Sequence, residues 1–416
     1  MTVPLYRTVL HSTQSSLKYS RSLLSFIPTS VPDNISVTEI SFPRRCEIML
    51  EGMTESQATG NVNAEWVVHG SSVDAEWRRK RGLKTSKQPH ASSGQSASSP
   101  DEKIILYFHG GAFFMGSPAT TRNLTSLFSE HTGSRVLSVA YRLAPENPFP
   151  LPLHDAISAY IGLIDPPSGS GMQKFKPSQI VVAGDSAGAS LAIALALWIR
   201  DNGSENGWKM PAGIVALAPW LDLTHSQPSF HLNSLDYLPV TVSDPAHITS
   251  NRSHYYTSDD SMNSNPLVSP LFAKDNAHDP ASQLPQTLIQ LGSRERLRDE
   301  GIMFAADSFK NSPIRIEIYS DMVHIFQPFA AKGEEMAINA FKSIGNFVKY
   351  NSDRSELSEA TYEKVNDIKK GFYYVSGSGV QEIGVENAVN IVAAARHELK
   401  LQKFVEVGNT NVQVSL

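Results

Sequence analysis

The sequence predicts an α/β protein with a mostly parallel sheet and helices on both faces. Two observations predict this class. Short runs rich in β-branched and apolar residues alternate with longer segments of helical periodicity, which is the pattern of successive βαβ units. Several runs are apolar throughout, as in Ile104–Phe108, and such runs are typical of strands buried on both faces of a parallel sheet.

The elements follow in chain order. Strands are expected at Ile35–Phe42, Ala64–His69, Lys103–Phe108, Arg135–Arg142, Gln179–Ala183, Gly213–Trp220, Thr287–Leu291 and Ile314–Tyr319. A helix over 334–350 closes this series, because Ala337, Phe341, Ile344 and Val348 recur on one face. A last helix is expected over Val385–Gln402, with Val385, Val389 and Val392 on one face. Packing of this face on the core is the default expectation, and another subunit or a membrane surface are the alternatives.

Composition divides the chain into three parts. Residues 1–60 are assigned to an N-terminal segment that contributes to a cap, with a short amphipathic helix at Ser16–Ile27. Residues 61–350 form the main domain, with a Ser-rich surface loop at 84–102 and an irregular insertion at about 225–282 that is interpreted as a lid or cap. Residues 351–416 are an extension of unknown role.

Composition also limits the function. In 416 residues, 41% are hydrophobic and 19% charged, against about 25% charged in typical domains, which excludes a disordered chain. The charge of 36 − 41 = −5 argues against a nucleic-acid partner. One cysteine, Cys46, permits neither an internal disulfide nor a cysteine-cluster metal site, and we expect no cofactor and no metal.

The chain carries no predicted targeting or membrane-spanning signal. Met1–Arg7 lack the basic start and apolar run of a signal peptide. The longest mostly apolar stretch, Ala187–Ile199, is shorter than the ~20 residues that span a bilayer. We therefore expect a soluble, cytoplasmic protein. Peripheral membrane contact and the oligomeric state stay open.

Ser186 is the predicted nucleophile. An apolar strand runs into Gly184-Asp185-Ser186-Ala187-Gly188, and a helix follows, so this G-x-S-x-G motif stands in the strand–turn–helix context that exposes a serine Oγ. Glycines are needed because side chains two residues on either side of the serine would collide in so sharp a turn. Without its flanking elements the motif would equally indicate a simple Gly/Ser turn.

A glycine-rich loop after Ile104–Phe108 is the predicted oxyanion hole. It reads His109-Gly110-Gly111-Ala112-Phe113. The N–H groups of Gly111, Ala112 and Ala187, with Gly110 a weaker candidate, would stabilise the oxygen that becomes negative when Ser186 attacks a carbonyl. His109 is interpreted as a brace for the loop rather than a proton carrier.

The acid and the base follow the last two predicted strands of the domain. Glu295 lies in the loop directly after Thr287–Leu291, whereas Asp299 and Glu300 come later, where acidic residues suit the first turn of a helix. His324 follows Ile314–Tyr319 and has the pKa range of a general base. The alternatives are a solvated charge for Glu295 and a structural loop histidine for His324. Asp155 and Asp222 are interpreted as loop supports.

These motifs, in this order, resemble the hormone-sensitive-lipase-like branch of the α/β-hydrolases over residues 60–350. The resemblance rests on the HGGAF and GDSAG motifs, Tyr141–Glu146, Asn265–Leu271 and Asp321–His324. It implies an eight-stranded α/β-hydrolase core with a helical cap that acts on carboxylic esters. It also implies that Glu295 takes the acid position, where relatives carry aspartate. In the oxyanion motif, Ala112 stands where the family's H-G-G-G form has its third glycine.

The expected function is a cofactor-free serine carboxylesterase with a Ser186–His324–Glu295 triad. The expected partner is a small hydrophobic ester with a short to medium acyl chain, and a deacetylase is suggested by the resemblance alone. Two alternatives stay open. An amidase or peptidase would use the same triad. A non-catalytic ligand receptor on a hydrolase scaffold would not need His324.

Overall fold

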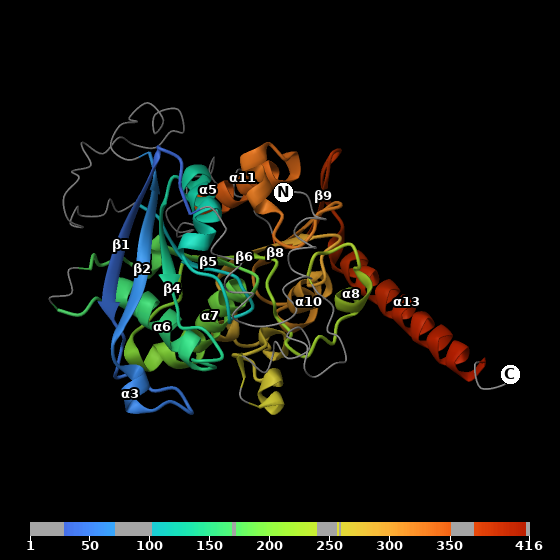
Figure 1. Ribbon diagram of the computed structural model, residues 1–416, viewed down its shortest axis with the longest axis horizontal. Coiled ribbons are helices and arrows are strands. Elements are labelled where there is room, and N and C mark those ends of the chain that lie inside the picture. The colour runs from blue at the N-terminus through green and yellow to red at the C-terminus, as the bar shows by residue number, and fades with distance from the viewer. Residues whose placement is uncertain are drawn as a thin grey trace.

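A ten-stranded sheet forms the centre of the computed structural model (Figure 1). The structure describes residues 29–70, 102–168, 172–238, 256–257, 259–350 and 370–412, without the side chains of 401 and 403–412. The strand order is β1-β2-β4-β3-β5-β6-β7-β8-β9-β10. The strands are β1 (Ile35–Pro43), β2 (Asn61–His69), β3 (Ile104–Phe108), β4 (Arg135–Ala140), β5 (Ile180–Asp185), β6 (Gly213–Leu217), β7 (Gln286–Gly292), β8 (Ile314–Tyr319), β9 (Gly371–Ser376) and β10 (Gly379–Glu382).

The predicted α/β class and all eight predicted strands are confirmed. From β4 to β9 neighbouring strands pair in parallel, and antiparallel pairs occur only at the two ends of the described sheet. Strand β6 ends at Leu217 rather than at the predicted Trp220. The reason is local: Ala218 takes a positive φ of 45°, which turns the chain out of the sheet.

The predicted strand count of eight was wrong. The two further strands, β9 and β10, lie in the 351–416 extension, which continues the hydrolase sheet. Strand β9 pairs in parallel with β8, and Phe372 and Val375 are buried there. The polar sequence around this hairpin concealed it, and β10, the last strand of the described sheet, buries none of its four residues.

The assignment of residues 1–60 to the cap is wrong for residues 35–43. They form β1, which pairs along its whole length with β2 at one edge of the sheet. Backbone pairing, rather than apolar contact with a cap, holds this part of the segment. The expected helix at Ser16–Ile27 lies outside the described residues, as do the Ser-rich loop up to residue 101 and residues 239–255 and 258 of the insertion.

Helices cover both faces of the sheet. Helices α5 and α11 lie on one face in Figure 1, and α6 and α7 lie on the other. Alternate strand residues supply the two cores: Ile105 and Tyr107 of β3 face α5 and α11, while Ile104, Leu106 and Phe108 join the α6 and α7 side. The helices are α3 (Glu55–Ala58), α5 (Arg122–Thr132), α6 (Leu151–Ile164), α7 (Ala187–Asn206), α8 (Pro228–Leu232), α10 (Arg298–Met303), α11 (Glu335–Tyr350) and α13 (Gly384–Val412).

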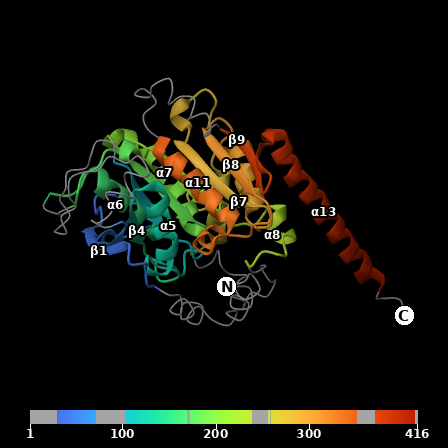
Figure 2. The same cartoon turned by 90° about the horizontal axis from the view of Figure 1, so that it is seen from above.

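Helix α11 confirms the predicted closing helix, but α13 differs from its prediction. It continues to Val412 and extends away from the body of the molecule (Figure 2). Its inward residues are Ala388, Val392 and Ala395, whereas Val385 is 52% exposed. Ala388 and Val392 belong to the same core as Phe230 of α8 and Ile302 of α10. The extension thus packs beside two short helices that follow β6 and β7.

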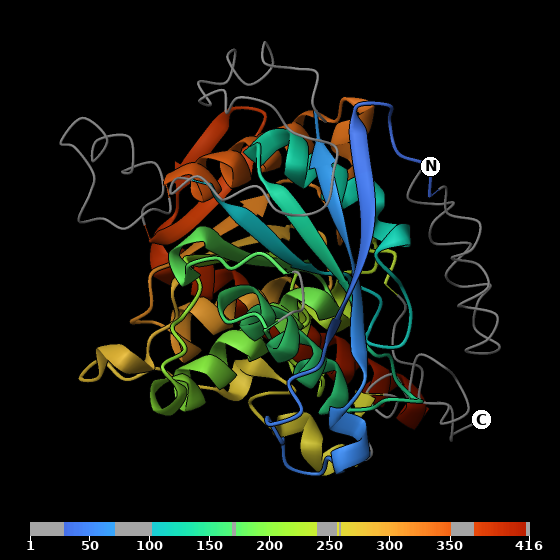
Figure 3. The ribbon, with the colours of Figure 1, turned by 90° about the vertical axis from the view of Figure 1, so that its left-hand side faces the viewer.

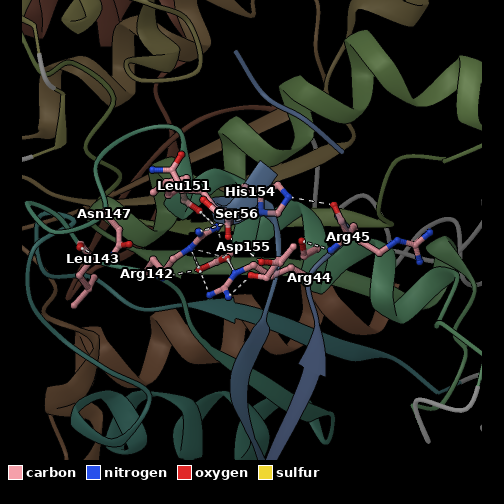
Figure 4. Close-up of polar contacts among 12 residues, drawn as sticks. Arg44, Arg45, Ser56, Arg142, Leu143, Asn147, Leu151, His154 and Asp155 are labelled. Carbon is pink, nitrogen blue, oxygen red and sulfur yellow. Dashed lines mark hydrogen bonds and ion pairs between the residues drawn. The ribbon is translucent and has the colours of Figure 1, made fainter. Parts of the chain in front are cut away.

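A buried ion-pair cluster ties the loop after β4 to the sheet edge. Asp155 of α6 is fully buried and pairs with Arg44 at 2.6 Å and with Arg142 at 2.9 Å (Figure 4). Arg142 also donates its backbone N–H to this carboxylate at 2.8 Å. Removing one partner would leave an unpaired charge in the interior, which is strongly destabilising. Asp155 therefore supports the loop after β4, as predicted. Figure 3 shows β1 and β2 crossing this side of the molecule.

Candidate active site

The loops that carry the predicted site residues leave four parallel strands at the same end of the sheet. The oxyanion loop follows β3, Ser186 follows β5, Glu295 follows β7 and His324 follows β8. The order β3-β5-β6-β7-β8 is parallel throughout, so the carboxyl ends of these strands lie together. The topology therefore gathers residues that are far apart in the sequence.

Ser186 lies on a strained turn between β5 and α7. Its backbone has φ 53° and ψ −121°, a conformation that costs a non-glycine residue about 1–3 kcal/mol. The surrounding packing holds it there: its N–H donates to Leu217 O at 2.8 Å, and its carbonyl accepts from Trp220 N at 3.2 Å. The side chain is only half-buried. A strained, accessible serine at the start of a helix suits a nucleophile.

Both glycines of the motif are required by contact with other backbone atoms. A Cβ at Gly184 would lie 2.4 Å from the carbonyl carbon of Gly188, and one at Gly188 would lie 2.0 Å from Phe108 O. The predicted collision is therefore confirmed. The second contact also shows that α7 begins directly against the end of β3.

The oxyanion loop has an unusual backbone. Gly111, Ala112 and Phe113 take φ values of 117°, 52° and 64°. A Cβ at Gly111 would lie 2.1 Å from Met115 O, so this glycine is needed for a close turn. Within the described chain no hydrogen bond is found from the N–H of Gly111 or of Ala112. The helix start at Ala187 leaves a third N–H without an intrahelical acceptor.

Gly110 does not fit the hole proposed from the sequence. Its N–H donates to Asp185 Oδ1 at 2.9 Å. That donor is therefore already satisfied, and a Cβ at Gly110 would lie 2.2 Å from Asp185 Oδ2. The close approach to Asp185 explains the glycine without any contact to a substrate.

Asp185 stands at a variable position of the G-x-S-x-G motif, yet its contacts are specific. It is buried and receives hydrogen bonds from Gly110 N–H and from the Tyr107 hydroxyl. Burial raises its pKa to about 6. Asp185 thus connects the nucleophile turn to the oxyanion loop through β3.

The contacts of His109 are those of a residue that supports the loop. Its ring stacks on Tyr141 at 4.3 Å, its Nδ1 donates to Gly110 O at 2.8 Å, and the Tyr141 hydroxyl donates to His109 O at 2.6 Å. Burial lowers the pKa of His109 to about 4, so the ring is neutral near pH 7. A neutral, stacked imidazole supports the loop.

The three acidic residues after β7 have different surroundings. Asp299 accepts from Ser229 N at 2.9 Å and from Arg298 Nε at 2.8 Å. Glu300 accepts from Leu221 N at 2.6 Å. Glu295 accepts from Gly292 N–H through Oε2 at 3.1 Å, and its buried Oε1 has no hydrogen bond to the described residues. Asp299 has both oxygens occupied, and Glu300 is bonded to the loop after β6. The buried Oε1 of Glu295 is therefore the best placed of these oxygens to accept from a further donor.

Glu295 and His324 are both buried, with exposures of 0% and 3%. Burial, and then the nearby Asp236 carboxylate, raise the pKa of Glu295. The His324 backbone N–H donates to Asp236 Oδ1 at 3.2 Å. Asp236 was not anticipated, because it lies in the irregular insertion and no periodicity or motif there marks it.

The described ranges contain no group of three or more His, Cys, Asp or Glu side chains arranged to hold a metal ion. Nor does any helix in these ranges have the length and apolar character needed to cross a bilayer.

Comparison with known proteins agrees with this geometry. Residues 105–328 match the α/β hydrolase fold family. An esterase of Acinetobacter venetianus is 33% identical over 246 residues, which cover 59% of this chain and 74% of that protein. An acetyl-hydrolase of Streptomyces hygroscopicus is 33% identical over 227 residues, which cover 54% of this chain and 69% of that protein.

Solved structures give the same result. One is described as an esterase from the bacterial hormone-sensitive lipase family; it is 25% identical, has a TM-score of 0.62, and the alignment covers 84% of this chain and 96% of that one. EstE5, soaked with p-nitrophenyl butyrate, is 26% identical with a TM-score of 0.61, over 84% of this chain and 97% of its own. The chain therefore belongs to the α/β hydrolase fold family, in its hormone-sensitive-lipase-like branch.

Proposed function

We propose that this protein is a serine carboxylesterase with Ser186 as nucleophile, His324 as general base and Glu295 as the orienting acid. The observation that carries the proposal is the strained, half-buried Ser186 at the carboxyl end of β5, with the Glu295 and His324 loops at the same edge of the sheet. The family and the esterase relatives support it.

The reaction proceeds in two halves. Ser186 Oγ attacks the ester carbonyl carbon while its proton passes to His324. The carbonyl oxygen becomes negative and accepts hydrogen bonds from the N–H groups of Gly111, Ala112 and Ala187. The imidazolium then protonates the leaving alcohol, and an acyl-enzyme remains. Water, deprotonated by His324, attacks the acyl-enzyme and releases the acid and free Ser186.

Glu295 orients the imidazole and stabilises its charged form. Its position in a dry environment strengthens that effect, since an ion pair of imidazolium and carboxylate gains more in a low dielectric. Proton uptake by His324 brings a positive charge beside a carboxylate whose charge burial disfavours. The positive His324 imidazolium and the negative Glu295 carboxylate therefore stabilise each other while the acyl-enzyme forms.

The substrate class follows from large rings beside the nucleophile. Trp220 is bonded through its backbone to Ser186 and lies 6.0 Å, ring to ring, from Phe113 of the oxyanion loop. Tyr256, from the insertion, stacks on Phe113 at 3.7 Å. These buried rings favour a short to medium acyl chain and a hydrophobic alcohol. The acetyl-hydrolase relative supports acetate esters as the first candidates.

The test is hydrolysis of p-nitrophenyl esters from acetate to palmitate by the wild type and by Ser186→Ala. We expect turnover that falls as the acyl chain lengthens, and a loss of about 10⁴-fold or more in the variant. Matched anilides separate an ester from an amide preference. If the folded wild type hydrolyses neither, the proposal fails, and tight binding of such a ligand without turnover would favour a receptor.

A further inference from the structure

Helix α8 and the segment that follows it are hydrogen-bonded to the loop that contains Glu295. Asn233 Nδ2 donates to Glu295 O at 2.6 Å, and Ser229 Oγ donates to Arg296 O at 2.7 Å. The Arg296 guanidinium returns bonds to Phe230 O and to Leu238 O. Residues 229–238 and the acid loop therefore form one hydrogen-bonded unit.

Asp236 extends this unit to the base. One carboxylate oxygen, Oδ2, accepts from Arg296 N at 2.8 Å. The other, Oδ1, accepts from His324 N at 3.2 Å and from Tyr237 N at 2.8 Å. Asp236 is 1% exposed. A single side chain thus bonds directly to the backbone of His324 and to that of the residue after Glu295.

Charge-assisted hydrogen bonds to a carboxylate are typically about 2.7–2.9 Å long. The bonds from Arg296 N and Tyr237 N, both at 2.8 Å, fall in that range, and the bond from His324 N at 3.2 Å is longer. The two loops leave the paired strands β7 and β8, and they bond to each other through Arg294 N and Met322 O at 2.9 Å. Asp236 adds a second tie, which reaches Arg296 and His324 themselves. The Tyr237 ring lies 5.9 Å from the His324 ring and adds a packing contact at the same place.

We propose that Asp236 is a positioning residue that holds the general-base loop and the acid loop in catalytic register, through its two carboxylate oxygens. The inference rests on the proposed roles of Glu295 and His324. Asp236 acts through the backbone and touches neither the substrate nor the transferred proton.

The test compares the whole protein with Asp236→Ala and Asp236→Asn. The asparagine variant keeps the volume but turns one acceptor into an NH₂ donor that faces a backbone N–H. Asp275→Asn is the matched control, since Asp275 also accepts a backbone N–H, that of Asn311 at 3.0 Å, and it lies at the opposite ends of β7 and β8. Hydrogen exchange of peptides 292–298 and 321–326 is measured beside kcat and KM.

We expect faster exchange in both peptides and a fall in kcat of about 10- to 100-fold with KM within threefold, because displaced reacting groups lower the chemical step. Asp275→Asn is expected to change neither peptide and to keep kcat within about threefold of wild type. A purely structural role would lower the melting temperature without this split between kcat and KM.

Unchanged exchange in either peptide of Asp236→Ala would overturn the proposal, as would faster exchange with an unchanged kcat. Exchange needs no substrate, so the tie between the loops is decided even if the wild type hydrolyses no ester. In that case the proposed esterase function fails, whereas faster exchange in both loops still supports the role of Asp236 in holding the two loops together.

Discussion

Replacing Glu295 by Gln tests the orienting role of this carboxylate with almost no change in volume. In the wild type, Oε2 accepts from Gly292 N–H. An amide NH₂ cannot face that donor, so the glutamine oxygen takes this position and its NH₂ replaces Oε1. In the proposed triad this NH₂ donates to His324 Nδ1, which leaves the proton on Nε2. An imidazole in that tautomer cannot accept the proton of Ser186.

The expected loss is large because the wrong tautomer removes the base. Tautomer reversal of this kind costs about 10⁴ in kcat in serine hydrolases, which corresponds to about 5.5 kcal/mol of transition-state stabilisation. Stability should not fall with activity. Burial raises the pKa of Glu295, so its charge at pH 7 opposes folding, and a neutral amide removes that cost.

The assay is p-nitrophenyl acetate hydrolysis at pH 7, with a thermal melt of each variant. Glu300→Gln is the matched control, since Glu300 is equally buried and its glutamine keeps the bond from Leu221 N through one oxygen. We expect the control to retain kcat within about threefold. A folded Glu295→Gln that retains more than a tenth of wild-type activity would refute the assignment.

Three further predictions follow from contacts and burial. Gly188→Ala should prevent folding or cost more than about 4 kcal/mol in urea unfolding, since its Cβ would lie 2.0 Å from Phe108 O, whereas Gly162→Ala, 3.3 Å from a flexible Met172 Cε, should stay within about 1 kcal/mol. Asp185 has a folded pKa of about 6 against 3.8, so its contribution to stability grows as pH falls from 6 to 4. The unfolding free energy of wild type minus that of Asp185→Asn should rise by about 2 kcal/mol between pH 7 and pH 4, and a constant difference would contradict the assigned burial. Val392→Ala should lower stability by about 2 kcal/mol, while Val385→Ala should leave it unchanged; equal effects would mean that α13 does not pack as described.

Local sequence determined the strands and the sharp turn that holds Ser186. Strands β3 to β8 were predictable because strands of a parallel sheet are buried on both faces and therefore read as apolar runs. The antiparallel strands β1 and β2 were predictable from their β-rich composition instead. Ser186 was predictable because its turn needs glycines at two set positions, a requirement that is written into five consecutive residues.

Tertiary structure decided what depends on contacts between distant segments. The Gly110 N–H is used by Asp185, and no local pattern states which of several adjacent N–H groups is already bonded. Asp236 bonds residues 60 and 88 positions away, so its surroundings were invisible along the chain. Strands β9 and β10 belong to the sheet because β8 offers an open edge with unpaired backbone groups, and only the folded sheet creates that edge.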